Sequence, residues 1–339
     1  MNISADTGEP VTIKFEQLCA TLMQSLGLCA ADEVTAVRPL TGGVASDIAA
    51  ISFRGRTVCA KFALGKLKVT EDWFAPVHRG RAEYAWLGAA GAVVPTAVPK
   101  LLGWSDAENG FAMEFIEGAN IYLWKTALLQ AAPPRGEAAA VARVLGQVHA
   151  ASATASFDRT PFDNAADFDE LRLDPYLRFT ATRYPALADA MIAMADALLH
   201  SRTALAHGDV SPKNILFRDG QPVILDAECA TMGDPAFDVA FCLNHLLLKS
   251  YHLPTMQISL RAEVLAFWRA YAGLIGWEPA AALEARVAAV LPMLLLARID
   301  GKSPVEYLTE PTREQVRAAA QPLIVAPAAD LAALLNRLQ

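Results

Sequence analysis

The sequence predicts an α+β fold with two lobes, a smaller N-terminal lobe built on an antiparallel sheet and a larger helical C-terminal lobe. Short strand-like runs separated by glycine turns dominate the first third of the chain. Long segments rich in Ala and Leu, with few strand formers, dominate the remainder. We place the lobes at residues 1–116 and 117–339.

The first lobe begins with a predicted amphipathic helix over 15–26, which ends at Gly27. Three strands are predicted over 34–40, 47–53 and 57–63, separated by turns that contain glycine. The turn after the first strand continues to Ser46 and contains Gly42 and Gly43, which would let backbone amides approach phosphates closely. Because T-G-G-V-A-S is neither G-x-G-x-x-G nor a Walker A sequence, an ordinary hairpin turn is the alternative to a nucleotide-binding loop.

A lysine in an apolar strand is the next notable residue of the first lobe. Lys61 stands in V-C-A-K-F, and a buried ammonium there needs an anion. We choose Glu83, in a predicted helix over 79–89, as its carboxylate partner beside the nucleotide phosphates. Glu71 is nearer in sequence but lies in a loop, and Glu83 in a solvated turn is the other alternative.

The second lobe is predicted to consist mainly of helices, over 120–131, 136–152, 185–200, 260–272, 280–298, 313–320 and 328–338. The most membrane-like run, 287–297, is too short to span a bilayer and contains Pro292, so a buried helix is expected. His149, alone on an Ala-rich helix, is expected to be structural. Pro235 is suited to open a further helix between Asp234 and Asp238.

The stretch 203–228 carries the strongest chemical signal. Two apolar runs flank a turn at 218–222, so a hairpin would bring Asp209, Asn214 and Asp226 to one end. Carboxylate and amide oxygens suit Mg²⁺, which keeps other positions for water and phosphates. A further carboxylate can accept the proton of an attacking hydroxyl. A pair of strands with solvated acidic ends is the alternative.

The pattern H-G-D-x-x-x-x-N, followed about a dozen residues later by a strand ending in Asp, resembles the aminoglycoside phosphotransferase and choline kinase superfamily, the small-molecule relatives of protein kinases. The resemblance implies a protein-kinase-like bilobal fold with its site in the cleft. It implies that Asp209 is the catalytic base, that Asn214 and Asp226 bind magnesium, and that His207 braces the loop. The D-x-E ending places Glu228 near the metal, and Asp238 is implied to anchor the catalytic loop.

The same resemblance assigns the remaining binding residues. Strands are predicted over 99–104 and 110–116, and the second ends in M-E-F-I-E-G, which resembles the hinge that binds adenine. Met113 would lie beside the base, and Glu114 and Ile116 would offer backbone groups to its edge.

Residues 61–73 resemble the lysine strand and Trp-containing loop of methylthioribose kinases, and 297–308 resembles their acceptor segment. Trp73, Arg298 and Asp300 are therefore acceptor candidates, with Lys66, Lys68 and Lys302 nearby. Where those enzymes have an arginine pair this chain has Arg298 alone, so a salt bridge at a helix end is an equal alternative for it. Cationic donors and an aromatic face suit a sugar-like, neutral or anionic acceptor better than a polycation.

Composition limits the partners. The net charge of −7 and the pI near 5.4 argue against nucleic acid or an anionic membrane as the main partner. The five cysteines are scattered without C-x-x-C, and no signal peptide is visible, so we expect a cytoplasmic protein without a disulfide framework. The expected partner is a small-molecule hydroxyl acceptor, and a homodimer is left open.

The sequence as a whole predicts an ATP- and Mg²⁺-dependent kinase for a small hydroxyl compound. A catalytically inert nucleotide-binding or interaction module on the same fold is the alternative from another class. Such modules typically lack one residue of the catalytic set, and here the set is complete, with Lys61, Glu83, Asp209, Asn214 and Asp226. A protein kinase is disfavoured because no A-P-E segment follows Asp226.

Overall fold

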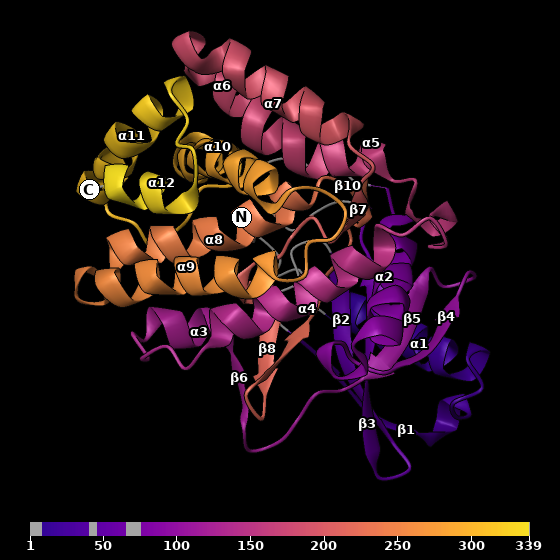
Figure 1. Cartoon of the computed structure of the whole chain (residues 1–339). Coiled ribbons are helices and arrows are strands. Elements are labelled where there is room, and N and C mark those ends of the chain that lie inside the picture. Colours follow the sequence, from indigo (N-terminus) through magenta and orange to yellow (C-terminus); the bar gives the residue numbers. More distant parts are fainter. Residues whose placement is uncertain (1–8, 41–45, 66–75, 339) are drawn as a thin grey trace, which may run out of the picture. The chain divides into compact units, whose positions relative to one another are not determined.

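The structure, a computed structural model, describes residues 9–40, 46–65 and 76–338 (Figure 1). Its contacts divide the chain into two units, the first made of residues 1–84 and 99–117 and the second of 85–98 and 118–339. The predicted lobes differ from these units mainly in the segment 85–98. Gly42, Gly43, Glu71 and Trp73, with Lys66 and Lys68, lie outside the described residues.

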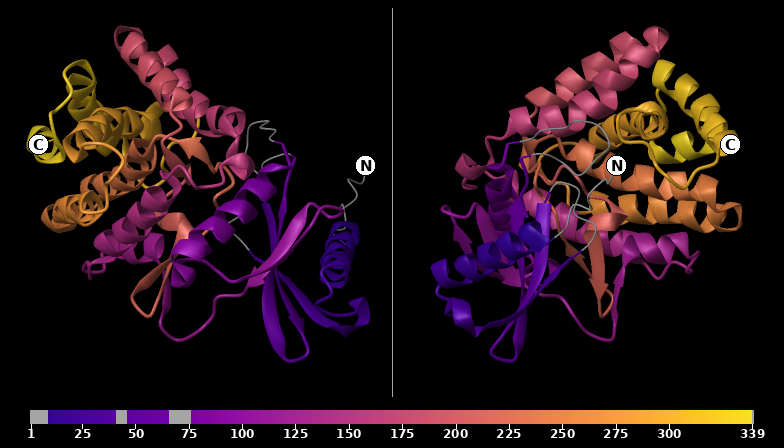
Figure 2. Two further views of the ribbon diagram at one scale, coloured as in Figure 1. Left: turned by 45° about the vertical axis from the view of Figure 1, so that its right-hand side comes forward. Right: turned by 180° about the vertical axis from the view of Figure 1, so that it is seen from behind.

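The first unit is built on a five-stranded antiparallel sheet in the order β1-β2-β3-β5-β4. The strands are β1 Val34–Pro39, β2 Ser46–Phe53, β3 Arg56–Ala63, β4 Leu101–Ser105 and β5 Gly110–Glu114. Helix α1, Glu9–Ser25, lies alongside this sheet (Figure 2). Its Cys19, Leu22 and Met23 pack with Ile51 and Phe53 in one apolar core, which explains the helical spacing seen in the sequence.

Helix α2, Arg79–Val93, begins where the sequence predicts and runs four residues further. The fully buried Arg79 holds its start, donating from Nη1 to Pro76 O at 2.9 Å and from Nη2 to Leu64 O at 2.7 Å. Tyr84 packs against Trp104 and Phe111 of the sheet. These contacts fix the turn of α2 that carries Glu83.

The second unit is a set of helices packed around α8, Pro235–His252, in which every residue from Pro235 to Ser250 is buried. Helices α9 and α10 pack on α8 (Figure 1), α4 packs on α9, and α11 packs on α10. The other major helices are α3 Trp124–Leu129, α4 Glu137–Ser152, α7 Ala188–His200, α9 Gln257–Ala272, α10 Ala280–Asp300, α11 Glu310–Val325 and α12 Leu331–Arg337.

Helix α10 is long and apolar enough to cross a membrane, and it is the one such helix among the described residues. Most of its residues are buried within the second unit, where it packs on α8 and α11. The expectation of a buried helix here is met, although the helix is longer than the apolar run alone indicated.

Two regions of the second unit differ from the sequence prediction. Residues 121–123, predicted as helix, form strand β6, Ile121–Leu123, because they pair with strand β8, Ile215–Arg218. The segment 153–184, for which no element was predicted, contains α5 Ala165–Phe168, a π-helix Asp169–Arg178 and α6 Phe179–Arg183. A π-helix is rare and often marks a functional site.

The stretch 203–228 contains three short strands, and a fourth follows it. Strand β7, Ala204–Ala206, pairs with β10, Thr231–Gly233, and β8 pairs with β9, Gln221–Ile224. Asp219 and Gly220 both have positive φ, at 51° and 75°, as a tight type I′ hairpin turn requires. The predicted hairpin is therefore formed.

We predict that Gly220→Ala lowers the free energy of unfolding by about 1 kcal/mol, because φ of 75° disfavours any residue with a Cβ. Gly273→Ala is the matched control. Gly273 has helical φ of −66° and open space around its Cα, so alanine there should be neutral or slightly stabilising. Urea unfolding of both variants makes the measurement, and equal effects would contradict the turn assignment.

Candidate active site

The loop 207–214 lies between β7 and β8, and Asp226 follows β9, all within the second unit. Ile215 pairs with Ile224, and Leu225 N donates to Asn214 O at 2.9 Å. This register puts Asn214, just before β8, next to Asp226, just after β9. The structure thus brings the predicted polar residues to the same end of the hairpin.

Asp238, near the start of α8, anchors the loop 207–214 by accepting hydrogen bonds from two of its backbone amides. Its Oδ2 accepts a hydrogen bond from His207 N at 2.6 Å, and its Oδ1 accepts one from Gly208 N at 2.8 Å. His149 Nε2 lies 3.3 Å from the same carboxylate, and His149 Nδ1 lies 2.7 Å from Tyr271 OH. Asp238 and His149 are fully buried, and their contacts agree with the structural roles predicted for both.

His207 braces the loop through both ring nitrogens. Its Nδ1 accepts from Asp209 N at 3.1 Å, so the ring proton is on Nε2, which donates to Leu225 O at 3.1 Å. Burial lowers the pKa of His207 and keeps the ring neutral. Trp86 packs edge-on against it, with the ring centroids 4.7 Å apart. His207 thereby ties the segment before Asp226 to the backbone of Asp209.

The carboxylate of Asp209 is buried between two cations. Arg172 Nη2 lies 3.0 Å and Lys213 Nζ 3.1 Å from its Oδ2. Burial alone would raise the pKa of Asp209, but the charges of Lys213 and Arg172 outweigh it and leave the pKa below its usual value. Within the described residues no group hydrogen-bonds to Oδ1. Asp209 is therefore ionised, oriented through one oxygen, and able to accept a proton on the other.

Arg172 is a site residue that the sequence analysis missed. It comes from the π-helix and is buried. Besides Asp209, it donates from Nε to Gly208 O at 2.6 Å and from Nη1 to Leu171 O at 2.8 Å. The available signal was an arginine flanked by Leu171 and Leu173, since a cation in an apolar context needs a specific anion.

The predicted metal ligands form a suitable oxygen set. Asn214 Nδ2 donates to Asp209 O at 3.1 Å, which leaves the amide oxygen as the group that can bind a cation. Asp226 has φ of 69°, a left-handed conformation that Asp tolerates better than most residues. Glu228, two residues after Asp226, is buried. No three His, Cys, Asp or Glu side chains of the described chain gather as a closed metal site, so any cation here would take part of its shell from water or phosphate.

In the first unit, Lys61 and Glu83 form the predicted ion pair. Lys61 Nζ lies 2.7 Å from Glu83 Oε2 and 2.8 Å from Oε1. Both residues are almost fully buried, at 4% and 2% exposed. Ser46, at the start of β2, is buried and pairs with Ala63. The pair fixes the lysine ammonium at the end of a rigid strand.

Part of the predicted adenine hinge already forms hydrogen bonds within the first unit. Met113 is buried in β5, and Glu114 N donates to Lys100 O at 2.8 Å. Glu114 Oε2 in turn accepts from Lys100 N at 3.1 Å. The Glu114 amide is therefore used in strand pairing and is not the group that meets adenine. Contacts from the Glu114 carbonyl and from Ile116 stay predictions.

The acceptor candidates on α10 have different surroundings. Asp300 accepts from Arg317 Nε at 2.9 Å and Nη2 at 3.0 Å, and also from Tyr184 OH. Its carboxylate thus joins α10 to α11, and contact with an acceptor stays a prediction. Lys302 is half exposed and paired with Asp174 at 2.8 Å. Arg298 forms no ion pair in the described part of the chain, so the salt bridge considered for it is absent there.

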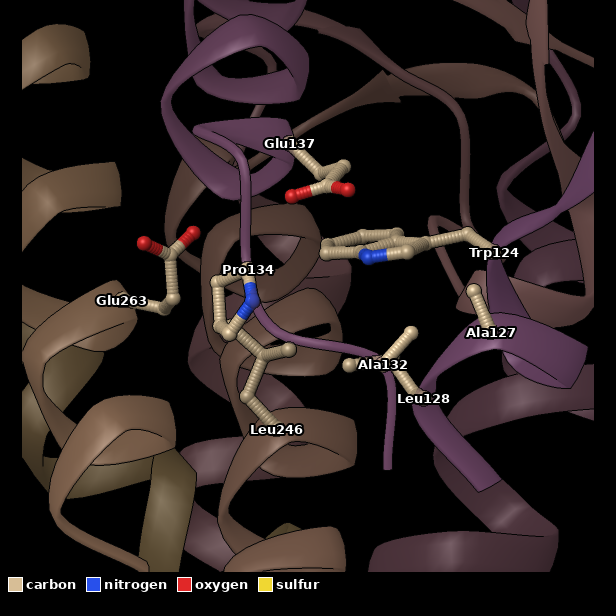
Figure 3. A pocket seen from close by; sticks show the side chains of 8 residues that line it. All are labelled: Trp124, Ala127, Leu128, Ala132, Pro134, Glu137, Leu246 and Glu263. Atoms are coloured by element: carbon tan, nitrogen blue, oxygen red, sulfur yellow. The ribbon is translucent and has the colours of Figure 1, made fainter. Parts of the chain in front are cut away.

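A small cavity between α3 and α4 carries no chemistry. Figure 3 shows Trp124, Pro134, Glu137 and Glu263 around it, and its volume of about 10 Å³ holds at most one water. Glu137 accepts from Tyr122 OH at 3.0 Å, and Glu263 accepts from Ala138 N at 3.3 Å. Both carboxylates are used to hold the start of α4.

Comparison with known proteins places this geometry in context. The sequence profile of the phosphotransferase enzyme family matches residues 37–283. No curated protein sequence matches the chain significantly.

Many solved structures share its fold, among them these three. A choline/ethanolamine kinase family protein from Mesorhizobium loti is 18% identical, with a TM-score of 0.54 and coverage of 96% of this chain and 98% of that one. An aminoglycoside phosphotransferase from Alicyclobacillus acidocaldarius is 17% identical, with a TM-score of 0.52 and coverage of 90% of this chain and 93% of that one. Amicoumacin kinase hAmiN, solved with AMP-PNP, Ca²⁺ and Ami, is 12% identical, with a TM-score of 0.55 and coverage of 94% of this chain and 97% of that one. The predicted kinase-like α+β fold, with an antiparallel sheet and a helical part, is confirmed.

We predict that Asp238→Asn lowers the free energy of unfolding by about 2 kcal/mol, because an amide cannot accept from both His207 N and Gly208 N. Asp189→Asn, at an exposed site in the first turn of α7, is the control and should change stability by only a few tenths of a kcal/mol. Urea unfolding compares them. If both variants were equally stable, Asp238 would not be the anchor of this loop.

Proposed function

The chain belongs to the phosphotransferase enzyme family, and from this premise we propose that it transfers the γ-phosphate of ATP to a hydroxyl of a small molecule, with Mg²⁺ and with Asp209 as the catalytic base. The observation that carries the proposal is the state of Asp209. It is ionised, held through Oδ2 by Arg172 and Lys213, and has Oδ1 available. A hydroxyl that donates to Oδ1 would lose its proton there as it attacks phosphorus.

Arg172 and Lys213 serve this step by holding the base and keeping it charged. A carboxylate with a depressed pKa is a weak base, so its main contribution is to orient the hydroxyl and to receive the proton late in the transfer. Arg172 also fixes Gly208 O, so one side chain positions both the base and the backbone before it. His207 and Asp238 restrain the same loop through its amides.

Asn214 and Asp226 would hold the magnesium ion, with Glu228 nearby. When bound, the ion neutralises charge on the phosphates and aligns the transferred group. In the first unit, the buried Lys61 would contact the phosphates while Glu83 keeps its ammonium oriented. Met113 is proposed to lie beside adenine, and the Glu114 carbonyl and the Ile116 backbone to meet its edge. The amicoumacin kinase, solved with AMP-PNP and Ca²⁺, supports a nucleotide and a hard divalent cation on this fold.

For the acceptor we propose a sugar-like neutral or anionic compound. Lys213 and Arg298 lie on the catalytic side of the second unit and would repel a polycation. Aminoglycosides should accordingly be poor substrates. We place the reaction in the cytoplasm, where ATP is abundant and thiols stay reduced. All five cysteines are buried and none forms a disulfide, which suits that compartment.

We predict that Asp209→Asn lowers kcat at least about 100-fold with a KM for ATP within about twofold of wild type, because it removes the proton acceptor and leaves the nucleotide contacts in place. The acceptor is first identified by screening hydroxyl metabolites, aminoglycosides and polypeptides separately for ATP consumption. Asp189→Asn should retain wild-type kinetics.

Full turnover of Asp209→Asn would contradict the assignment of the base. Consumption of ATP only with polypeptide acceptors would contradict the substrate class. ATP binding without transfer to any acceptor would favour an inert nucleotide-binding module.

A further inference from the structure

A second cavity of the second unit lies beside the catalytic loop, between α3, α8, α10 and the segment that follows α10. Its volume is about 30 Å³, enough for a compact polar group but not for a sugar ring. It is lined by Lys125, Pro212, Lys213, His245, Lys249, Arg298, Val305, Glu306 and Tyr307, which we call the basic pocket.

The charges of the basic pocket do not balance. Lys125, Lys213, Lys249 and Arg298 contribute cations, whereas Glu306 is its one acid. That carboxylate is already paired with Lys125 at 2.6 Å and lies on the exposed side. Lys213 is paired with Asp209, whose carboxylate lies outside the lining of the cavity. Lys249 and Arg298 are therefore the two cations of the basic pocket that form no ion pair with any described residue.

Lys249 is the most unusual residue of the basic pocket. It projects from α8, is 1% exposed, and has its ammonium 5.1 Å from the centre of the Tyr307 ring. Within the described residues its ammonium has no hydrogen bond and no ion pair. Burial, with the charges of Lys125 and Arg298, lowers the pKa of Lys249 to about 7. A desolvated lysine without a counter-ion costs stability, which a ligand anion would recover.

Two further hydrogen-bond donors at the basic pocket also lack an acceptor among the residues that the structure describes. Tyr307 OH and Arg298 Nε are buried and have no hydrogen-bond partner in the described chain. The Nη1 of Arg298 donates to Ser303 Oγ at 2.8 Å and to Ser303 O, which fixes the guanidinium beside the cavity. Unpaired buried donors are rare in folded proteins, and three at one cavity indicate a missing acceptor. Water could satisfy a hydroxyl but would not balance the charge.

The basic pocket is connected directly to the catalytic base. Lys213 lines it, and the Nζ of Lys213 lies 3.1 Å from Asp209 Oδ2. A group held in the pocket is thus one lysine side chain away from the carboxylate proposed to activate the hydroxyl. This position suits a part of the acceptor that does not react.

We propose that the basic pocket binds a compact oxyanion of the acceptor, a carboxylate or a phosphate group, through Lys249, Arg298 and Tyr307. The substrate is then a small hydroxyl compound that carries a negative charge, such as a sugar acid or a sugar phosphate. The hydroxyl-bearing part lies outside the cavity, which has room for the anionic group alone. This inference rests on the proposed phosphotransferase function.

Binding is tested first, without turnover. Isothermal titration calorimetry measures wild type and Lys249→Met against inorganic phosphate, acetate, D-gluconate, D-glucose 6-phosphate and the neutral sorbitol. Wild type should bind at least one anion and not sorbitol, and Lys249→Met should bind that anion at least about tenfold more weakly. Which anion binds separates carboxylate from phosphate. The control is Lys302→Met, because Lys302 is exposed and paired with Asp174.

The pH dependence adds a second readout. A bound anion favours protonated Lys249, so the affinity for acetate or D-gluconate, whose carboxylates stay ionised in this range, should fall as pH rises above 7, by up to about tenfold per pH unit. The other charged or titratable groups that act on Lys249 or line the pocket with it are Lys125, Lys213, His245, Arg298, Glu306, Tyr307 and Cys242. Burial lowers the pKa of His245 well below its usual value and raises the pKa of Tyr307 and of Cys242, so these three side chains stay neutral between pH 7 and 8. Lys249→Met should lose this dependence. It should also fold at least as stably as wild type, because it removes a buried amine.

The inference is overturned if no anion binds, or if Lys249→Met binds anions as tightly as wild type. It is also overturned if the screen yields only neutral or cationic acceptors, a result that would leave the proposed phosphotransferase activity intact. Anion binding that depends on Lys249, without transfer to any acceptor, supports the pocket and contradicts the proposed function instead.

Discussion

The contact between the Asp238 carboxylate and two successive backbone amides is the constraint on which the site depends. Asp238 belongs to α8, the most buried helix of the second unit, and its two oxygens accept from His207 N and Gly208 N. Gly208 has φ of 79°, and a Cβ there would lie 2.8 Å from that of Cys229. Only glycine therefore fits here, because the loop packs directly against Cys229 in a left-handed conformation. The loop then turns outward at Asp209 with its carboxylate already placed, and His207 extends the restraint to Leu225, next to Asp226. The core of the protein thus positions the chemistry through backbone hydrogen bonds.

The functional residues differ in whether the protein itself supplies a partner for their charge. Asp209 has Arg172 and Lys213, and Lys61 has Glu83, so these groups are charged and oriented before any substrate arrives. Such pairs are costly to desolvate, and their value lies in holding a fixed geometry. Lys249 has no such partner in the described chain, and its pKa falls accordingly. The same physical rule explains both observations, because a buried charge must be neutralised by the protein, by deprotonation or by a bound ion.

Alternating apolar residues and turn residues in the sequence predicted most of the structure that is formed between residues close along the chain. The hairpin after Asn214, the turn at Asp219 and Gly220, and the strand with Lys61 all follow from alternation and turn residues. What could not be predicted depends on distant segments. Residues 121–123 became a strand because β8 supplied hydrogen bonds, and the helical composition around them gave no sign of it. Arg172 lies in a π-helix for which no periodicity is diagnostic. Asp300 has the residue type of an acceptor ligand, but its binding to Arg317 is visible only once α11 packs on α10. Lys249 ends an apolar run of α8, where a solvated helix end is the natural expectation and full burial the finding.

The proposed metal and phosphate contacts are tested most directly by a crystal structure with AMP-PNP and Mn²⁺, in which anomalous scattering locates the cation. We predict a cation bound by the Asn214 amide oxygen and the Asp226 carboxylate, at a coordination distance of about 2.1 Å, the value typical of Mg²⁺. We also expect Lys61 to contact the phosphates and Asp209 to lie outside the metal shell. A cation bound directly by Asp209 would contradict this arrangement. So would a nucleotide whose phosphates neither contact Lys61 nor share the cation with Asp226.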